Sequence, residues 1–370
     1  MSEYRGSTRE QALDIINLHR LEDDARQNME VGPFGYLREG AEDEYTLKQN
    51  LKAWETKRII PRVLRNLDTQ DTRTSLLGID ISMPIIQAPV AAQKLAHVDG
   101  ENATARAVAD VGSIFTLSAY GSTLISEAHE IAPEAPQFFQ LYMSKHDDFN
   151  KYILEKAREN KVKAIVLTAD APLNGYREDD IINKFVFPFP LSNLADYAAQ
   201  SAQSEVGSNA GTSLTDIYAG AKQALEPGDI AKIKEFSGGL PVLVKGVQCA
   251  EDAMIAIGAG ADGVWVSNHG GRQLDGGPGS FEMLGEVAEA VAKQVPIVFD
   301  SGIRRGSHVF KAIANGADVV AIGRPVLYGL NLGGRQGVES VYNHLNKELK
   351  IIMQLAGTPN IEAIKKAKLV

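Results

Sequence analysis

The sequence predicts a single (β/α)8 barrel of the α/β class, with an N-terminal helical cap and a long lid loop after the fourth strand. From Met83 onward, short runs of β-branched residues alternate with helical patterns, as in βα units on a parallel sheet. Most of these runs are nearly continuous in apolar residues, as buried parallel strands are. Eight such units most simply close into a barrel, and an open doubly wound sheet is the alternative.

The predicted strands are Met83–Val90, Ser113–Ser118, Gln137–Tyr142, Ala164–Asp170, Pro241–Val247, Gly263–Asn268, Pro296–Gly302 and Asp318–Arg324. The helices predicted among and after them are Thr104–Val111, Phe149–Asn160, Asp229–Phe236, Glu251–Ile257, Phe281–Lys293, Ser307–Asn315 and Val338–Leu355.

Two segments lie outside this alternation. Residues 1–82 contain predicted helices at Leu21–Met29 and Tyr45–Lys57, and we expect them to cap the lower end of the barrel. Residues 171–226 are rich in Ser, Ala, Asn and Gly in their middle. Loops of this length without secondary structure are uncommon unless they cover or bind something, so we expect a mobile lid over the barrel mouth. The barrel then spans 83–357, and residues 1–370 are predicted to form one domain.

Charge and cysteine content exclude several classes of protein. There are 38 Lys and Arg against 47 Asp and Glu, a net charge of -9, which argues against nucleic acid or an anionic membrane as a bulk partner. The single cysteine, Cys249, can form neither an intramolecular disulfide nor a Cys-based zinc site. With no secretory signal pattern and no run of roughly 20 apolar residues, we expect a cytoplasmic protein and no membrane partner.

Polar residues stand at the end of nearly every predicted strand, where a barrel of this kind has its catalytic mouth. For any single residue an ordinary polar cap is a sufficient explanation, but their coincidence in one register predicts a shared site. These residues are Ser118, Gln140, Tyr142, Thr168, Asp170, Lys245, Ser267, His269, Asp300 and Arg324.

The last two strands carry a phosphate-binding pattern. Asp300-Ser-Gly-Ile-Arg-Arg-Gly306 leads into a helix, and the next strand ends in Gly323-Arg324. Glycines let backbone amides approach an anion, a helix start offers free N–H groups, and arginine adds a forked cation. An ordinary turn with solvated arginines explains the glycines but not two adjacent arginine-bearing turns. The Gly-x-Gly-x-x-Gly match at Gly258–Gly263 precedes a strand, which is the wrong context for a dinucleotide site.

A second group of residues surrounds His269. A histidine after a barrel strand can act as a base, and Arg272 in the same loop can bind a carboxylate with its two-pronged guanidinium. Asp170 can orient His269 and stabilise its protonated form, and Arg177 follows in the same segment. No set of histidines suggests a metal site. Lys245 can be either a Schiff-base nucleophile or a fixed cation beside a cofactor ring.

The run Ser267-Asn-His-Gly-Gly-Arg-Gln-Leu-Asp275 resembles the signature of the FMN-dependent (S)-2-hydroxy acid oxidase family. The resemblance covers residues from about 20 to 357, and Asn183-Lys-Phe-Val-Phe-Pro188 and Ile217-Tyr218 are most similar to the bacterial L-lactate oxidase subgroup. The other matching phrases are Phe34–Glu44, Gln87–Ala92, Gln140–Tyr142, Leu167–Asp170, Val244–Gly246, Asp300–Arg304 and Gly323–Pro325.

The resemblance implies that FMN lies across the barrel mouth. Its phosphate would be held by glycines and arginines of the last two strands, Asp300 would bind the ribityl hydroxyls, and Lys245 would face N1 and the C2 carbonyl of the ring. The cofactor-binding residues it implies are Pro89, Val90, Ala91, Ser118, Gln140, Thr168, Lys245, Ser267, Asp300, Ser301, Gly302, Arg304, Gly323 and Arg324.

The resemblance also implies a substrate site. The carboxylate of a small 2-hydroxy acid would pair with Arg177 and Arg272, helped by Tyr36; Tyr142 would contact the hydroxyl, and His269 with Asp170 would be the base. The implied reaction is oxidation of L-lactate to pyruvate, with dioxygen giving hydrogen peroxide, in a homotetramer. Removal of the hydroxyl proton with hydride transfer and removal of the α-proton first require the same residues.

Other functions remain open at this stage. A same-family dehydrogenase or monooxygenase, an oxidase of glycolate or another 2-hydroxy acid, a barrel aldolase using Lys245, and a non-catalytic flavin-binding protein are the alternatives. The sequence departs from the subgroup at Phe187, where tyrosine is usual, at Gly270-Gly271, where Gly-Ala is usual, and in a longer lid. These departures leave the catalytic groups intact but leave the preferred acid undetermined.

Overall fold

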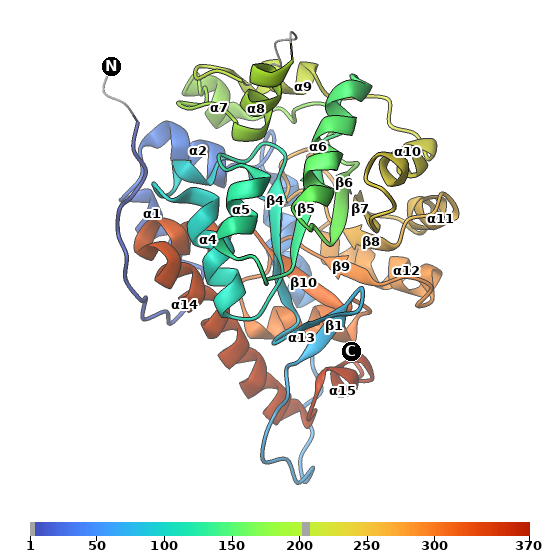
Figure 1. Ribbon diagram of the computed structural model, residues 1–370. Coiled ribbons are helices and arrows are strands. Elements are labelled where there is room, and N and C mark those ends of the chain that lie inside the picture. The colour runs from blue at the N-terminus through green and yellow to red at the C-terminus, as the bar shows by residue number, and fades with distance from the viewer. Residues whose placement is uncertain (1–3, 202–207) are drawn as a thin grey trace.

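The computed structural model describes residues 4–201 and 208–370. Its centre is a barrel of parallel strands, which confirms the predicted fold class (Figure 1). Each strand lies inside its predicted run but is shorter, because the first or last residues of the runs belong to the connecting loops. The strands are β3 (Ile85–Gln87), β4 (Phe115–Ser118), β5 (Gln137–Leu141), β6 (Ala164–Thr168), β7 (Val242–Val247), β8 (Gly263–Val266), β9 (Ile297–Phe299) and β10 (Val319–Ile322).

The first strand of the barrel pairs with the last. The sheet order is β3-β10-β9-β8-β7-β6-β5-β4, with parallel pairing at each step. β3 and β4 then meet through a parallel bridge between Val90 and Leu117, and the Gln87 N–H donates to the Ile114 carbonyl at 3.0 Å. The sheet therefore closes on itself, and an open doubly wound sheet is excluded.

Helices surround the barrel, and three of them differ from the prediction. The helix after β4, α5, and the short helix near the end of the chain, α15, have no counterpart in the prediction. The last long helix begins at Arg324, well before the predicted Val338, because Gly333 and Gly334 interrupt its pattern with a kink. The surrounding helices are α4 (Gly100–Asp110), α5 (Ile125–Ile131), α6 (Asp147–Glu159), α10 (Gly228–Phe236), α11 (Ala250–Gly258), α12 (Ser280–Val291), α13 (Gly306–Ala314), α14 (Arg324–Ala356) and α15 (Ile361–Lys365).

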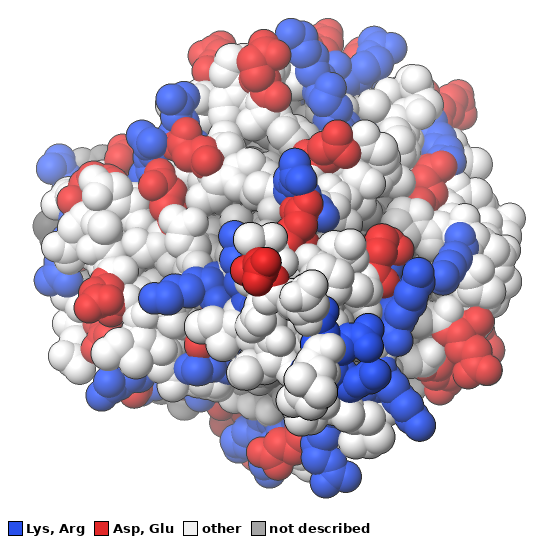
Figure 2. All heavy atoms as spheres, turned by 90° about the horizontal axis from the view of Figure 1, so that it is seen from below, with Lys and Arg blue, Asp and Glu red and all other residues white. Residues whose placement is uncertain are grey.

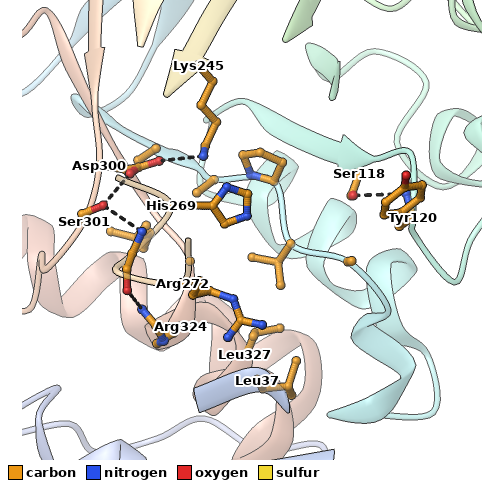
Figure 3. Close-up of a pocket in the computed structure, with 18 of the residues that line it drawn as sticks. Leu37, Ser118, Tyr120, Lys245, His269, Arg272, Asp300, Ser301, Arg324 and Leu327 are labelled. Carbon is orange, nitrogen blue, oxygen red and sulfur yellow. Dashed lines mark hydrogen bonds and ion pairs between the residues drawn. The ribbon is translucent and has the colours of Figure 1, made fainter. Parts of the chain in front are cut away.

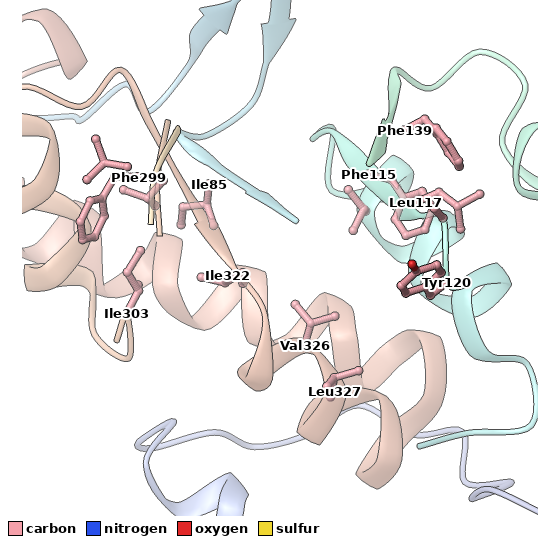
Figure 4. Close-up of a cluster of buried hydrophobic side chains, with 14 of the residues drawn as sticks. Ile85, Phe115, Leu117, Tyr120, Phe139, Phe299, Ile303, Ile322, Val326 and Leu327 are labelled. Carbon is pink, nitrogen blue, oxygen red and sulfur yellow. The ribbon is translucent and has the colours of Figure 1, made fainter. Parts of the chain in front are cut away.

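Alternate residues of each strand point into the barrel and out of it. Ile86, Phe138 and Trp265 belong to an inner apolar cluster, whereas their neighbours Ile85 and Phe139 belong to the outer cluster that packs against the helices (Figure 4). The inner cluster lies in the lower part of the barrel. The next inward-facing side chain of a strand, two residues further toward its carboxyl end, therefore lies at the mouth.

The N-terminal segment reaches both ends of the barrel, whereas the prediction placed it at the lower end. The hairpin of β1 (Thr74–Leu76) and β2 (Ile79–Ile81) closes the lower end, where Leu76 and Ile81 join the inner cluster. The helical part lies on the other side, and Thr46 N–H donates to Asp275 in the loop after β8 at 2.7 Å. Its elements are α1 (Arg20–Arg26), α2 (Val31–Arg38), α3 (Tyr45–Lys52) and the 3-10 turn η1 (Ala53–Glu55); a further turn, η2 (Gln93–Leu95), follows β3.

The segment after β6 lies over the barrel mouth, as predicted for a lid, but it is largely helical. It contains α7 (Glu178–Ile182), α8 (Ser192–Gln200) and α9 (Leu214–Ala219), which lie above the strands in Figure 1. Part of the Ser- and Gly-rich stretch, 202–207, lies outside the described residues. Phe187 and Leu191 are buried. The Phe187 ring meets the Tyr36 ring of α2 edge-on at 5.2 Å, and the Ser192 N–H, next to Leu191, donates to the Gly121 carbonyl in the loop after β4.

Acidic and basic side chains are interspersed on the face seen in Figure 2. Within the described residues, no helix is both long and apolar enough to cross a membrane.

Candidate active site

A cavity of about 950 Å³ opens at the carboxyl ends of the strands, between the barrel and the lid. Sixteen of the predicted site residues line it: Tyr36, Pro89, Val90, Ala91, Ser118, Tyr142, Arg177, Lys245, His269, Arg272, Asp300, Ser301, Gly302, Arg304, Gly323 and Arg324. The four others, Gln140, Thr168, Asp170 and Ser267, form hydrogen bonds directly beneath the lining residues.

The period-two register of the strands explains why these side chains converge. Lys245 follows the inward-facing Leu243 by two residues, and Ser267 follows Trp265 in the same way. Gln140, Thr168 and Asp300 stand in the same relation to Phe138, Val166 and Val298. Each strand therefore supplies apolar filling below and one polar group above, because successive side chains alternate between the two faces of a sheet.

His269 is held between a carboxylate and a phenol. Its Nδ1 lies 2.8 Å from Asp170 Oδ1, and its Nε2 lies 3.4 Å from the Tyr142 hydroxyl at the cavity. His269 has a φ of 58°, a left-handed conformation that costs energy for a residue with a side chain. Such strain is typical of residues fixed for function rather than for packing.

The charges around His269 favour a neutral imidazole beside an ionised carboxylate. Burial, helped by Lys245 and Arg177, lowers the pKa of His269 even though Asp170 acts in the opposite direction. Burial alone would raise the pKa of Asp170, but Lys245 and His269 outweigh it and keep that pKa below its usual value. A neutral histidine can accept a proton, and the carboxylate stabilises the cation that results.

Arg177 and Arg272 present two buried guanidinium groups to the same cavity. Arg272 lies with its Cζ 5.3 Å from the centre of the Tyr36 ring, and its Nη1 donates to the Glu39 carbonyl at 2.9 Å. Arg177 Nη2 donates to Gln273 Oε1 at 3.1 Å. Neither forms a salt bridge with a carboxylate in the described part of the chain, although the acidic Glu39 and Asp180 lie nearby behind them. Two guanidinium groups that face the cavity without a salt-bridge partner suit a carboxylate ligand.

Lys245 is a buried cation placed between two carboxylates. Its Nζ lies 3.8 Å from Asp170 Oδ2 and 4.0 Å from Asp300 Oδ2. Asp300 also accepts hydrogen bonds from Trp265 Nε1 at 2.8 Å and Ser267 Oγ at 2.6 Å. Figure 3 shows Lys245 and His269 facing the same space. A lysine held near two carboxylates suits electrostatic stabilisation of a cofactor better than nucleophilic attack.

Beside Lys245, which pairs with Thr168 across β6 and β7, three polar side chains form a row over neighbouring strands. Ser118 Oγ donates to Gln140 Oε1 at 2.8 Å, and Gln140 Nε2 donates to Thr168 Oγ1 at 2.9 Å. All three are almost completely buried. A planar heterocycle with donors and acceptors along its edge fits such a row.

The last two strands supply an anion site. Arg304 and Arg324 line the cavity, and neither forms a salt bridge within the described ranges. Burial, together with Arg272 nearby, lowers the pKa of Arg324 to about 9, which shows how little negative charge surrounds it. Gly302 has a φ of 78°, and a Cβ there would lie 2.1 Å from the Asn50 carbonyl oxygen. The glycine, the two arginines and the start of α14 fit a bound phosphate.

Arg324 also ties three segments of the mouth together. It donates to the carbonyls of Arg38, Glu39 and Gly270, at 3.0, 2.9 and 2.9 Å. These bonds use three of its five N–H donors and leave two for a ligand. The loop it holds requires Gly271, because a Cβ there would lie 2.5 Å from the Leu47 backbone nitrogen.

Sequence reasoning missed several lining residues. Tyr120 and Tyr218 line the cavity beside Tyr142; the Tyr120 ring stacks on the Tyr142 ring at 4.5 Å, and the Tyr218 ring meets it at 69°. Leu214, in α9 of the lid, and Leu327, in α14, add apolar surface. The register that carries Ser118 inward could have suggested Tyr120, two residues later, but no local pattern marks the lid residues.

No group of three or more His, Cys, Asp or Glu side chains is placed to hold a metal ion, as far as the described residues extend.

Over nearly its whole length the chain is similar to proteins named lactate oxidases. The chain is 51% identical to an L-lactate oxidase of Lentilactobacillus hilgardii over 366 residues, which are 99% of this chain and 97% of that protein. It superposes on a crystal structure of a lactate oxidase of Pediococcus acidilactici with a TM-score of 0.94 at 50% identity, covering 99% and 98% of the two chains. A mandelate oxidase structure with (S)-4-hydroxymandelic acid gives 0.88 at 34% identity, covering 96% and 99%. The family described as FMN-dependent dehydrogenase matches residues 25–370, and this chain therefore belongs to that family.

Proposed function

We propose that this protein oxidises L-lactate to pyruvate and passes the electrons to dioxygen, which gives hydrogen peroxide. The observation that carries the proposal is the His269–Asp170 pair facing the same cavity as Arg177 and Arg272, a base beside a site for a carboxylate. Relatives that are named L-lactate oxidases and share about half of their residues with this chain support the choice of acid and of acceptor.

The cavity fits FMN, the cofactor of the family. Arg304, Arg324 and the backbone at Gly302 would hold its phosphate, because this is where buried positive charge lacks an anion. Lys245 would lie beside the ring where negative charge develops on reduction, and Asp300 would accept hydrogen bonds from the ribityl chain. Bound FMN supplies the acceptor for the two electrons that leave the substrate.

We propose the following roles for the side chains that act on the substrate. Arg177 and Arg272 bind the carboxylate, and Tyr36 supports Arg272 through its ring face. The His269 Nδ1–H group donates a hydrogen bond to Asp170, which leaves Nε2 unprotonated and able to accept the substrate's proton. Asp170 then stabilises the imidazolium that forms. Tyr142, with its hydroxyl beside Nε2, contacts the substrate hydroxyl. Burial raises the pKa of Tyr142, which stays protonated.

The pH dependence of kcat/KM follows from the lowered pKa of His269 in the free enzyme. The base must be neutral to act, so activity falls as pH decreases through its pKa. Because burial and neighbouring cations lower this pKa, we expect the acid limb of the profile to lie below the ordinary histidine value of 6.5. Steady-state rates with L-lactate across the acid range measure this limb, and a midpoint above 6.5 would contradict the assignment.

Replacing Arg272 by lysine should mainly weaken substrate binding. A single ammonium group cannot form the two parallel hydrogen bonds of a guanidinium, and it cannot stack on the Tyr36 ring in the same way. We expect KM for L-lactate to rise by about 10- to 100-fold, with a smaller change in kcat. An unchanged KM would exclude Arg272 from binding the carboxylate.

A substrate panel tests the reaction itself. L-lactate, glycolate, mandelate and longer 2-hydroxy acids are supplied with air, and hydrogen peroxide and the 2-oxo acid are measured together. We expect the highest kcat/KM with L-lactate and equal yields of the two products. Activity with an artificial acceptor but without peroxide would indicate a dehydrogenase, a peroxide yield below the lactate consumed would indicate a monooxygenase, and borohydride trapping of a substrate on Lys245 would indicate an aldolase.

We also propose that the chain is one domain, that it assembles as a homotetramer and that it resides in the cytoplasm. The family resemblance supports the assembly, and a lone cysteine that needs no oxidising compartment is consistent with the location. Light scattering should give four times the chain mass, limited proteolysis should give no stable fragment, and fractionation of cells that produce the protein should place it with cytoplasmic markers.

A further inference from the structure

Two buried acidic side chains, Glu39 and Asp180, lie next to the substrate arginines without lining the cavity. Glu39 follows α2 and is 2% exposed; Asp180 lies in α7 and is 8% exposed. The Asp180 backbone N–H donates to Glu39 Oε2 at 3.2 Å. The other three carboxyl oxygens, Glu39 Oε1 and both of Asp180, have no hydrogen-bond partner among the described residues. The mechanism proposed above gives this pair no role.

Ionising both carboxyl groups at once would require a large free energy. Within the described part of the chain neither forms a salt bridge, and a buried carboxylate without partners is strongly disfavoured. A proton held between them turns one oxygen into a donor and gives the other group a hydrogen bond. In agreement, burial and the adjacent Asp180 raise the pKa of Glu39 to about 8, although Arg272 and Arg177 lower it.

The charged groups that face this pair come from four elements. Arg177 precedes α7, Arg272 lies in the loop after β8, and Arg324, at the start of α14, donates to the Glu39 carbonyl. Tyr36, in α2, stays neutral because burial raises its pKa to about 12. Asp179, next to Asp180 in α7, packs against Gly35 of α2 and adds one acidic group, whereas the three arginines supply positive charge. The protonation of the pair therefore sets how much of that positive charge remains for a ligand.

We propose that Glu39 and Asp180 share one proton and act as positioning residues for Arg177 and Arg272, so that loss of this proton weakens binding of the substrate carboxylate. This rests on the proposed function in that the ligand is a carboxylate held by the two arginines. A doubly ionised pair lowers the positive potential at the cavity and attracts the guanidinium groups away from it. Repulsion between the two carboxylates also pushes α2 and α7 apart. Tyr36 lies in α2, and Arg177 directly precedes α7, so both would move with these helices.

Infrared spectroscopy of the holoenzyme tests for the shared proton independently of turnover. At pH 7 we expect the carbonyl band of a protonated carboxyl group, and we expect it to disappear as the pH rises through about 8. Glu39→Gln and Asp180→Asn should each lack this band, because the remaining carboxylate then has an amide donor. Glu178→Gln, which removes an exposed carboxylate from the same helix, should keep it. Absence of the band in the wild type, or its persistence in both variants of the pair, overturns the shared proton.

The dependence of KM on pH tests the effect on substrate. For the wild type we expect KM for L-lactate to rise by about tenfold as the pair ionises, and we expect no such rise in Glu39→Gln or Asp180→Asn. The acid limb of kcat/KM, which His269 controls, should be the same in all three proteins. An equal rise of KM in the wild type and both variants overturns the coupling. If L-lactate is not oxidised at any pH, the proposed function fails. The affinity for pyruvate, measured across pH by the change in flavin absorbance, still tests whether ionisation of the pair weakens carboxylate binding.

Discussion

His269→Ala is expected to lower kcat for L-lactate by about 10³-fold while FMN remains bound. General-base catalysis typically contributes between 10² and 10⁴ in rate, and His269 is the cavity-lining base that Asp170 holds at 2.8 Å. The variant leaves Arg177 and Arg272 in place, so binding of pyruvate should change little. Single-turnover reduction of the flavin, measured by its absorbance, isolates this step from oxygen reactivity.

Two further variants make the interpretation of His269 specific. His146→Ala, which removes an exposed histidine before α6, should retain wild-type activity. The double variant His269→Ala with Asp170→Asn should lose no more activity than His269→Ala alone, since Asp170 acts through the imidazole and has nothing left to orient. Near-normal turnover by His269→Ala with FMN bound, or fully additive losses, would contradict the proposed base.

Arg304→Met should weaken FMN binding by about 100-fold and yet leave the apoprotein at least as stable as the wild type. A charge-assisted hydrogen bond contributes about 1.5–3 kcal/mol, and Arg304 offers several to a phosphate. Without a bound anion, however, the buried charge of Arg304 destabilises the folded apoprotein. Burial lowers the pKa of Arg304, and the raising effects of Tyr328 and Glu22 do not offset it. Methionine fills similar space without that charge.

The two effects are measured together by thermal unfolding with and without FMN. The wild type should gain far more in Tm from saturating FMN than Arg304→Met, because the stabilisation depends on the ratio of ligand concentration to Kd. Arg305→Met is the matched control: the neighbouring arginine forms a salt bridge with Glu348 at 2.7 Å, away from the cavity. A variant apoprotein that is clearly less stable than the wild type, with unchanged FMN affinity, would assign Arg304 a structural role instead.

The strands and most site residues could be predicted because short-range rules decide them. Alternation in a strand sets which residues face inward, and closure of the barrel brings all the strand ends together, so Lys245 and Asp300 were recognisable from sequence alone as members of one shared site. The same rules could not place Tyr218 or Leu214, because a lid is positioned by contacts such as that of the Phe187 ring with Tyr36 of α2 rather than by periodicity. These rules also could not predict that, within residues 1–82, the β1–β2 hairpin and the helices lie at different ends of the barrel, since both precede the alternating strands and helices.

The Glu39–Asp180 pair was invisible in the sequence for a different reason. Its two members are more than a hundred positions apart, and charged residues in polar segments ordinarily face water. Only the packing of α2 against α7 buries them side by side. Local patterns therefore predict what a strand presents, whereas the protonation state of a carboxyl group depends on contacts between distant segments.

The pairing of β3 with β10 determines when during synthesis the cavity can exist. Its lining runs from Tyr36 to Leu327, and the barrel has no closed wall until the last strand has taken its place beside the first. Almost the whole chain must therefore leave the ribosome before the cofactor can bind. Until then, the earlier strands have one unpaired edge. Supply of FMN during production of the protein then acts at the end of folding, by trapping chains that have already closed.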